Sequence, residues 1–260
     1  MKLTFGQRCG ALLLTLLLTT AFLQPYFYPM DIGFQDLSNM LASPDSESWL
    51  GTDHLGRDMF ARLASAIRLS FGLSLFSVAC ALLAGLLFGI LAGLFGGWLD
   101  RLFSFICDLV MALPGLLLIL LFASLSPGSF WTLYLGIALV IWVEFFRVVR
   151  AITSTLASSA ERQSSRLMGM TWFYCIKRHL LPRLLPMIAT LTAFSIGNAI
   201  LALATLGFVS VGLRPPTAEL GLMMTELFPY YYQAPLIFLQ PVMAVFLLVL
   251  SLQLLAGRVK

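Results

Sequence analysis

Ser210 is the side chain whose setting comes closest to enzyme chemistry. It lies in the pattern Gly207-x-x-Ser210-x-Gly212, which is faintly similar to the turn that exposes a nucleophilic serine in hydrolases. Such a serine needs a base within hydrogen-bonding reach, and the chain has only two histidines, His54 and His179. His179 lies beyond the far end of the apolar segment that precedes Ser210, about 30 Å away if that segment crosses a membrane. We therefore predict no catalytic residue and keep an intramembrane protease only as a remote alternative.

Cysteine and histidine side chains could also hold a metal ion or perform redox chemistry. The chain has four cysteines, but no two of them have the spacing of a zinc or redox pair. We interpret them as small apolar residues in helix packing, and we expect no metal site and no cofactor within this chain. His54 could ligate a metal, but residues 51–58 are better interpreted as a structural or docking loop in which Asp53, Arg57 and Asp58 form an ion-pair network.

The chain lacks a phosphate-binding loop. The pattern Gly-x-x-x-x-Gly-Lys-[Ser/Thr] requires a lysine directly after a glycine, and none of the three lysines, Lys2, Lys177 and Lys260, follows one. If the protein depends on ATP, then ATP and Mg²⁺ must be bound by separate partner subunits.

Two acids lie inside apolar segments, where carboxylates are costly and often functional: Asp108 and Glu144. Arg147 follows Glu144 by one helical turn, so we expect an ion pair between these two residues. Asp108 is expected to pair with Arg101 or another arginine at the same end of the helices, or else to have a functional role of its own.

The elements that must position these residues are helices in a membrane. The chain has 260 residues, of which 60% are hydrophobic and only 11% charged, whereas soluble domains carry about 25% charged residues. Six apolar segments have the length of a membrane span; they cover residues 9–28, 69–95, 102–125, 131–149, 184–211 and 236–255. The first has Lys2 and Arg8 in front but no small-x-small cleavage site behind it, so we expect a retained span.

The charges of the loops predict the orientation. Residues 147–183 hold seven basic side chains and one acid, Glu161, whereas residues 30–68 hold six acids and three arginines. The positive-inside rule places the first segment in the cytoplasm and the second outside, and six crossings then leave both termini in the cytoplasm. The net charge of +4 is thus a feature of membrane orientation, and we expect no nucleic-acid partner.

The predicted fold class is an all-α polytopic membrane protein with about six transmembrane helices in one domain, residues 1–260. It divides into a first span (1–30), an external segment (31–68) and a five-helix core (69–256) with a cytoplasmic loop at 151–182. In the second span Ala81, Gly85, Gly89 and Gly93 recur every four residues, a spacing that indicates close packing against another helix.

The cytoplasmic loop has a helical pattern of its own. Gly169 can adopt a positive φ and so permits a sharp turn between two short helices. Pro182 suits the start of the following helix, where its missing N–H costs nothing. We predict a helix–turn–helix that lies along the membrane surface and docks a cytoplasmic partner.

Several segments of the chain resemble the permeases of binding-protein-dependent ABC importers. The spacing from Gly169 to Pro182 matches their cytoplasmic motif, although Gln163, Ser164 and Ser165 replace its usual Glu-Ala-Ala opening. The segments 50–58, 108–114 and 206–221 are similar to further motifs of the dipeptide, oligopeptide and nickel branch, and within it to the second of two paired permeases.

The resemblance implies a type I importer permease fold and assigns residues to three roles. Coupling to an ATPase would involve Gln163, Ser164, Ser165, Arg166, Gly169, His179 and Pro182. The translocation path would include Asp108, Met111, Ser195 and Asn198, although Ser195 and Asn198 could instead bond a neighbouring helix. The external signature loop would consist of Gly51, Asp53, His54, Gly56, Arg57 and Asp58.

The implied partners are a second homologous permease, two cytoplasmic ATPase subunits, an extracytoplasmic solute-binding protein and the lipid of a bacterial inner membrane. The implied solutes are short peptides, nickel or metal–chelator complexes. The alternative is an ATP-independent secondary transporter or channel, which would be expected to show an inverted repeat or several coupled intramembrane charges.

Overall fold

The computed structural model describes residues 4–126 and 128–257, without the side chains of Arg162, Gln163, Arg166, Trp172 and Phe173. Within this part the protein is helical, and its only β-type pairing is an isolated bridge between Thr52 and Asp58. The helices long enough to cross a membrane are α1 (Phe5–Phe27), α2 (Met59–Phe95), α5 (Phe130–Ala157), α8 (Leu181–Phe208) and α10 (Pro235–Ala256). A sixth span is possible if the bent pair α3 (Gly97–Met111) and α4 (Gly115–Leu125) counts as one.

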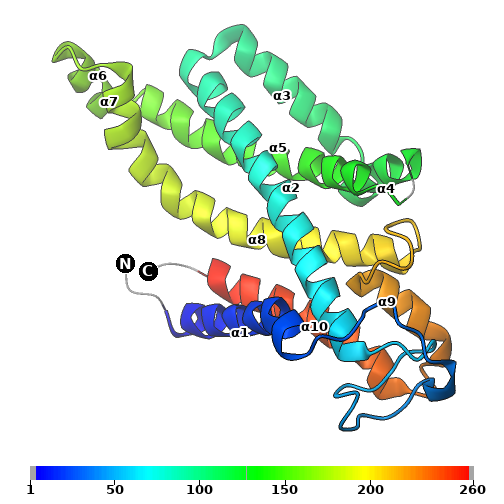
Figure 1. Ribbon diagram of the computed structural model, residues 1–260. Helices are drawn as coiled ribbons and strands as arrows, with labels where there is room; N and C mark the ends of the chain where they lie inside the picture. Colours follow the sequence, from blue (N-terminus) through cyan, green and yellow to red (C-terminus); the bar gives the residue numbers. More distant parts are fainter. Residues whose placement is uncertain (1–3, 127, 258–260) are drawn as a thin grey trace.

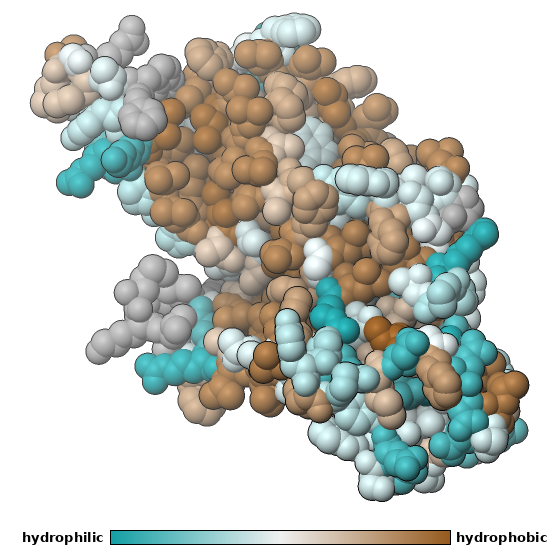
Figure 2. Space-filling view, viewed as in Figure 1, coloured by the Kyte–Doolittle hydropathy of each residue, from teal (hydrophilic) through white to brown (hydrophobic). Residues whose placement is uncertain are grey.

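The remaining helices are short and lie at the two ends of the long ones (Figure 1). They are η1 (Leu37–Asn39), α6 (Ala160–Leu167), α7 (Trp172–Cys175), η2 (Ile176–Leu180), α9 (Leu220–Leu227) and η3 (Phe228–Tyr230). We call the end that carries α6 and α7 the Gly169 end, and the end that carries residues 30–58 and α9 the Gly51 end. Hydrophobic side chains cover the long helices between these ends, and hydrophilic side chains gather at the Gly51 end (Figure 2).

The third predicted span, 102–125, is not one continuous helix. The chain breaks between Met111 and Gly115, and α3 and α4 are bent by 84° relative to each other. Pro114 favours a break here, because a proline disfavours the helical conformation of the residue before it. The apolar composition continues through the break and conceals it in the sequence.

Two other boundaries differ from the sequence-based prediction. Helix α2 begins at Met59, so the last ten residues of the predicted external segment are helical. Asp58 starts this helix early by accepting a hydrogen bond from the Ala61 N–H at 2.7 Å. Helix α5 continues to Ala157, so the loop at the Gly169 end is shorter than the predicted 151–182.

The predicted packing of the glycine stripe is confirmed. A Cβ atom at Gly85 would lie 2.4 Å from the Phe145 Cβ, and one at Gly93 would lie 2.7 Å from the Thr153 Cβ. Gly89 faces Val149 in the same way. Because both rows advance by four residues, α2 and α5 stay in contact over about two turns at a distance that only glycine permits.

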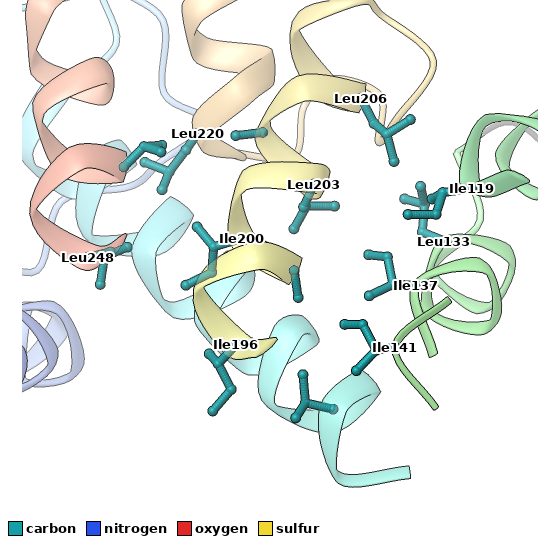
Figure 3. Close-up of a cluster of buried hydrophobic side chains, with 14 of the residues drawn as sticks. Ile119, Leu133, Ile137, Ile141, Ile196, Ile200, Leu203, Leu206, Leu220 and Leu248 are labelled. Carbon is teal, nitrogen blue, oxygen red and sulfur yellow. The ribbon is translucent and has the colours of Figure 1, made fainter. Parts of the chain in front are cut away.

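Helix α8 lies at the centre of the buried apolar cluster. Figure 3 shows Ile196, Ile200, Leu203 and Leu206 of α8 between the side chains of α4 and α5 on one side and those of α10 on the other. Helices α1 and α10 run side by side, and the Gln7 side chain donates to the Gly257 carbonyl at 2.8 Å. The result is a bundle whose functional candidates lie at its two ends and along one face of α5 and α8.

Candidate functional site

The Gly169 end carries the predicted helix–turn–helix, which the structure confirms as α6, a turn and α7. Gly169 has a φ of +72°, the left-handed conformation that ends many helices at glycine. The next N–H, from Met170, reaches back to the Ser165 carbonyl at 3.0 Å and closes the end of α6. Sequence reasoning therefore identified the turn and its position correctly.

Two side-chain contacts brace α6 against η2 and the start of α8. Arg183 at the start of α8 donates to both oxygens of Glu161, at 2.8 and 2.7 Å. The Ser165 hydroxyl lies 3.2 Å from the His179 Nε2. The turn is thereby fixed to η2 and to the start of α8, while its tip exposes the apolar side chains of Leu167, Met168 and Met170. The side chains of Gln163 and Arg166, both predicted coupling residues, lie outside the described set, and Ser164 is exposed.

Pro182 is the second residue of α8, where the sequence predicted a helix start. No loop separates it from α7, because the π-helical segment η2 joins the two helices. The proline ring would collide with the carbonyl four residues earlier in a regular α-helix, and the wider turn of η2 accommodates it.

The Gly51 end contains a buried cluster of four charged side chains. The Arg57 Nε lies 2.6 Å from the Asp53 carboxylate, which also contacts Arg62. Both arginines also reach the Glu226 carboxylate of α9, Arg57 at 2.9 Å and Arg62 at 2.8 Å. Backbone N–H groups of Leu55 and Arg57 also donate to Asp53. Burial opposes ionisation, but the Arg62 charge and these hydrogen bonds together hold the pKa of Asp53 below its usual value.

Only part of the predicted ion-pair network at residues 51–58 is correct. Asp53 and Arg57 are paired, but Asp58 is not part of this cluster: it caps α2 and accepts from the Tyr28 hydroxyl at 2.8 Å. The sequence did not predict that Arg62 and Glu226 belong to the cluster. Glu226 lies 169 residues beyond Arg57, so no local spacing connects these two residues.

Gly51 and Gly56 are required by the shape of the signature loop. Both have a positive φ, +79° and +72°. A Cβ atom at Gly56 would come within 1.8 Å of the Asp36 carbonyl oxygen, and one at Gly51 within 2.3 Å of the Ala42 carbonyl oxygen. The loop thus folds tightly onto residues 36–42.

Asp53, His54 and Glu226 bring potential metal-ligand atoms within 4.8 Å of one another. Both carboxylates are engaged by Arg57 and Arg62, whose guanidinium charges oppose the binding of a cation. The His54 ring stacks on Tyr230 with centroids 5.5 Å apart. Burial lowers the pKa of His54 and so disfavours the charged form of the ring in this stack.

A cavity of about 210 Å³ lies between α4, α5 and α8. Its polar lining consists of Glu144 from α5 and Asn198 from α8, and apolar side chains and Gly115 form the rest. Of the four predicted path residues, only Asn198 lines it. Ser195 is buried, and Asp108 and Met111 are exposed on α3.

The predicted Glu144–Arg147 ion pair is wrong. Arg147 instead donates to Asp108 of α3 at 2.9 Å, which confirms the expectation that Asp108 pairs with a nearby arginine. Arg150 and Asp100 form a second pair between the same helices, with the Arg150 Nη2 2.6 Å from the Asp100 Oδ2. These cross-helix partners hold α3 against α5 and leave Glu144 free to face the cavity.

Residues 85–260 match the family described as "Binding-protein-dependent transport system inner membrane component". The chain belongs to this family. The permease is 34% identical over 252 residues to the glutathione transport system permease protein GsiD of Pectobacterium atrosepticum, covering 96% of this chain and 84% of that one. It is 31% identical over 256 residues to the nickel transport system permease protein NikC of Escherichia coli, covering 98% and 92%.

A solved structure shares the fold of the permease. This is the MetNI methionine ABC transporter in an inward-facing conformation, with a TM-score of 0.61 and 19% identity over 77% of this chain and 95% of that one. The predicted type I importer permease fold and the resemblance to permeases of the peptide and nickel branch are both confirmed.

The serine pattern at residues 207–212 has a structural role in the permease. Ser210 follows the end of α8 with a φ of +62°, and the Val211 N–H donates to the Leu206 carbonyl at 3.1 Å. This is the helix-ending arrangement in which a left-handed residue satisfies the last carbonyls. The pattern therefore marks a helix end.

Proposed function

We propose that the permease forms half of a translocation path in an ATP-driven importer and is driven by a separate ATPase at its α6–α7 turn. The observation that carries this proposal is the protruding turn itself. It exposes Leu167, Met168 and Met170 to solvent, and exposed apolar groups of this kind mark interaction sites.

The partners follow from this role. A second homologous permease completes the path, two cytoplasmic ATPase subunits bind ATP and Mg²⁺, and an extracytoplasmic binding protein delivers solute to the Gly51 end. The excess of basic residues near Gly169 supports a cytoplasmic location for that end and for both termini, in a bacterial inner membrane. ATP binding would close the ATPase pair and rock the helices from inward-open to outward-open.

The proposed solutes are short peptides, nickel or metal–chelator complexes. The names of the two relatives, glutathione and nickel transport permeases, support this range. The permease carries few groups suited to binding a bare metal ion, so a peptide or chelate fits its largely apolar path better.

The test is a pair of substitutions at Gly169. Its φ of +72° strains any β-branched residue, although nothing lies within 4 Å of the added Cβ. Gly169→Val should distort the turn and lower ATP-dependent uptake severely, whereas Gly169→Asn should keep most of it because asparagine tolerates this conformation. Uptake and co-purification of the ATPase are measured in parallel. Equal, normal uptake by both variants would refute coupling through this turn, and a permease that transports without any ATPase would favour a secondary transporter.

A further inference from the structure

Glu144 and Asn198 are the two polar side chains of the cavity between α4, α5 and α8. The other lining residues include Ile119, Ile137 and Ile141, which face α8 in Figure 3. A carboxylate and an amide thus converge on one hollow whose walls are otherwise apolar, which is the usual composition of a ligand site.

Glu144 lies near the middle of α5 and inside the predicted span 131–149. It is the fifteenth of the 28 residues of α5, which places it about 20 Å from either end of the helix at 1.5 Å per residue. An ionised carboxylate inside a membrane span is costly unless it meets water or a positive charge.

Neither side chain has a hydrogen bond or ion pair with any other residue in the part of the chain that the structure describes. The obvious partner, Arg147, is bound to Asp108 at 2.9 Å. Both Glu144 and Asn198 are exposed in the isolated subunit, so a group from outside it can reach them.

We propose that Glu144 and Asn198 form a subsite for the primary ammonium group of the transported solute. The inference rests on the proposed transport function and names the chemical group that this site recognises. An ammonium has three donors, which the two carboxylate oxygens and the Asn198 amide oxygen can accept. A bare metal ion is a poorer fit, because transition metals prefer imidazole or thiolate ligands and the cavity offers neither.

The size of the cavity is consistent with a subsite. Sites that enclose a whole drug-sized ligand have volumes of about 300–1,000 Å³, and this one has about 210 Å³. It is therefore too small for a whole drug-sized solute but large enough for the end that carries the ammonium group, and we expect the remainder of a larger solute to face the second permease.

The first test measures the charge preference of the cavity without any solute. In the complete transporter with Cys9, Cys80, Cys107 and Cys175 replaced by alanine, Asn198→Cys is treated with methanethiosulfonate reagents that carry either trimethylammonium or sulfonate. We compare the ratio of the two rates, cationic over anionic, at Asn198→Cys with the same ratio for free cysteine. The ratio at Asn198→Cys should be about tenfold higher, which corresponds to a preference of about 1.4 kcal/mol for the positive charge. Adding Glu144→Gln should remove most of this preference.

The matched control is Leu201→Cys, since Leu201 is exposed on the same helix but does not line the cavity. Its reactivity should not respond to Glu144→Gln. Failure of either reagent to reach Asn198→Cys, or a charge preference that survives Glu144→Gln, would overturn the proposal.

The second test uses transport by the complete system with alanyl-alanine and glutathione as probes, since both carry a primary ammonium. Glu144→Gln should lower the maximal uptake rate of an accepted probe about tenfold, Glu144→Asp should restore part of it, and binding-protein-stimulated ATP hydrolysis should persist. If Glu144→Gln instead prevents association with the second permease, Glu144 forms an ion pair between subunits and the subsite is refuted. Loss of ATP-dependent uptake in the unmodified transporter would contradict the proposed function itself, and the cysteine experiment would still decide the charge preference.

Discussion

Replacing Asp53 by asparagine should destabilise the permease more than any other single removal of a charge at the Gly51 end. Asp53 is fully buried and contacts Arg57 and Arg62, which share Glu226 as their second acid. The cluster is balanced at two positive and two negative charges, so Asp53→Asn leaves one excess buried positive charge. The asparagine NH₂ would also face arginine N–H donors.

Removing one partner of a buried ion pair typically costs about 3–5 kcal/mol. Since 1 kcal/mol shifts the midpoint of a chain of this size by about 2–4 °C, we expect the thermal midpoint to fall on the order of 10 °C. The assay is thermal unfolding of the detergent-solubilised protein, followed by size-exclusion chromatography.

The matched control is Asp36→Asn. Asp36 belongs to the same segment, is only partly buried, and its carboxylate binds only Ser38 within the described chain, so the midpoint of this variant should not change measurably. A double variant, Asp53→Asn with Arg62→Met, should recover part of the loss because it restores the charge balance. If Asp53→Asn and Asp36→Asn unfold at the same temperature, the charged cluster does not stabilise this end.

Three further outcomes follow from the structure. The pKa of Asp53 is lower in the folded protein than the value of about 3.9 expected in the unfolded chain. The stability that Asp53 contributes is therefore complete above about pH 4 and is lost as the pH falls through the folded-state pKa. Below about pH 4 the thermal midpoint should decrease, and it should decrease less steeply in Asp53→Asn. Gly85→Ala should lower the free energy of unfolding by about 1–3 kcal/mol because its Cβ would overlap α5, whereas Gly72→Ala, which meets open space, should not lower it in the same denaturation assay. Glu161→Gln should reduce uptake at an almost unchanged thermal midpoint, because its half-exposed pair with Arg183 orients α6 but adds at most about 1 kcal/mol; normal uptake would show that this brace is dispensable.

Patterns within one segment predicted structure well. The four-residue spacing of Ala81, Gly85, Gly89 and Gly93 predicted close helix packing, and Gly169 predicted a sharp turn, because each depends on sterics that glycine alone relieves. The spans were recognised from hydropathy for the same reason, since the bilayer imposes a similar length and composition on every crossing.

Partner choice across the fold could not be predicted from the sequence. Arg147 lies one turn from Glu144 but binds Asp108, because α3 folds back against α5 and offers a closer carboxylate. Glu226 is distant in sequence from Arg57 and Arg62, and only the packing of α9 onto the Gly51 end brings them together. The 84° bend between α3 and α4 also depends on what each half packs against, and Pro114 alone indicates only that a break is possible.

The glycine-lined contact between α2 and α5 has a mechanical consequence. Helix α5 leads into α6 at the Gly169 end, and α2 begins beside the charged cluster at the Gly51 end. With 37 residues, α2 is about 55 Å long. The close contact of its glycines with α5 leaves the two helices little freedom to slide along each other or to separate. We therefore expect α2 and α5 to move together as one rigid unit. A tilt imposed on α5 at one membrane surface would then move the start of α2 at the opposite surface, without first deforming the rest of the bundle.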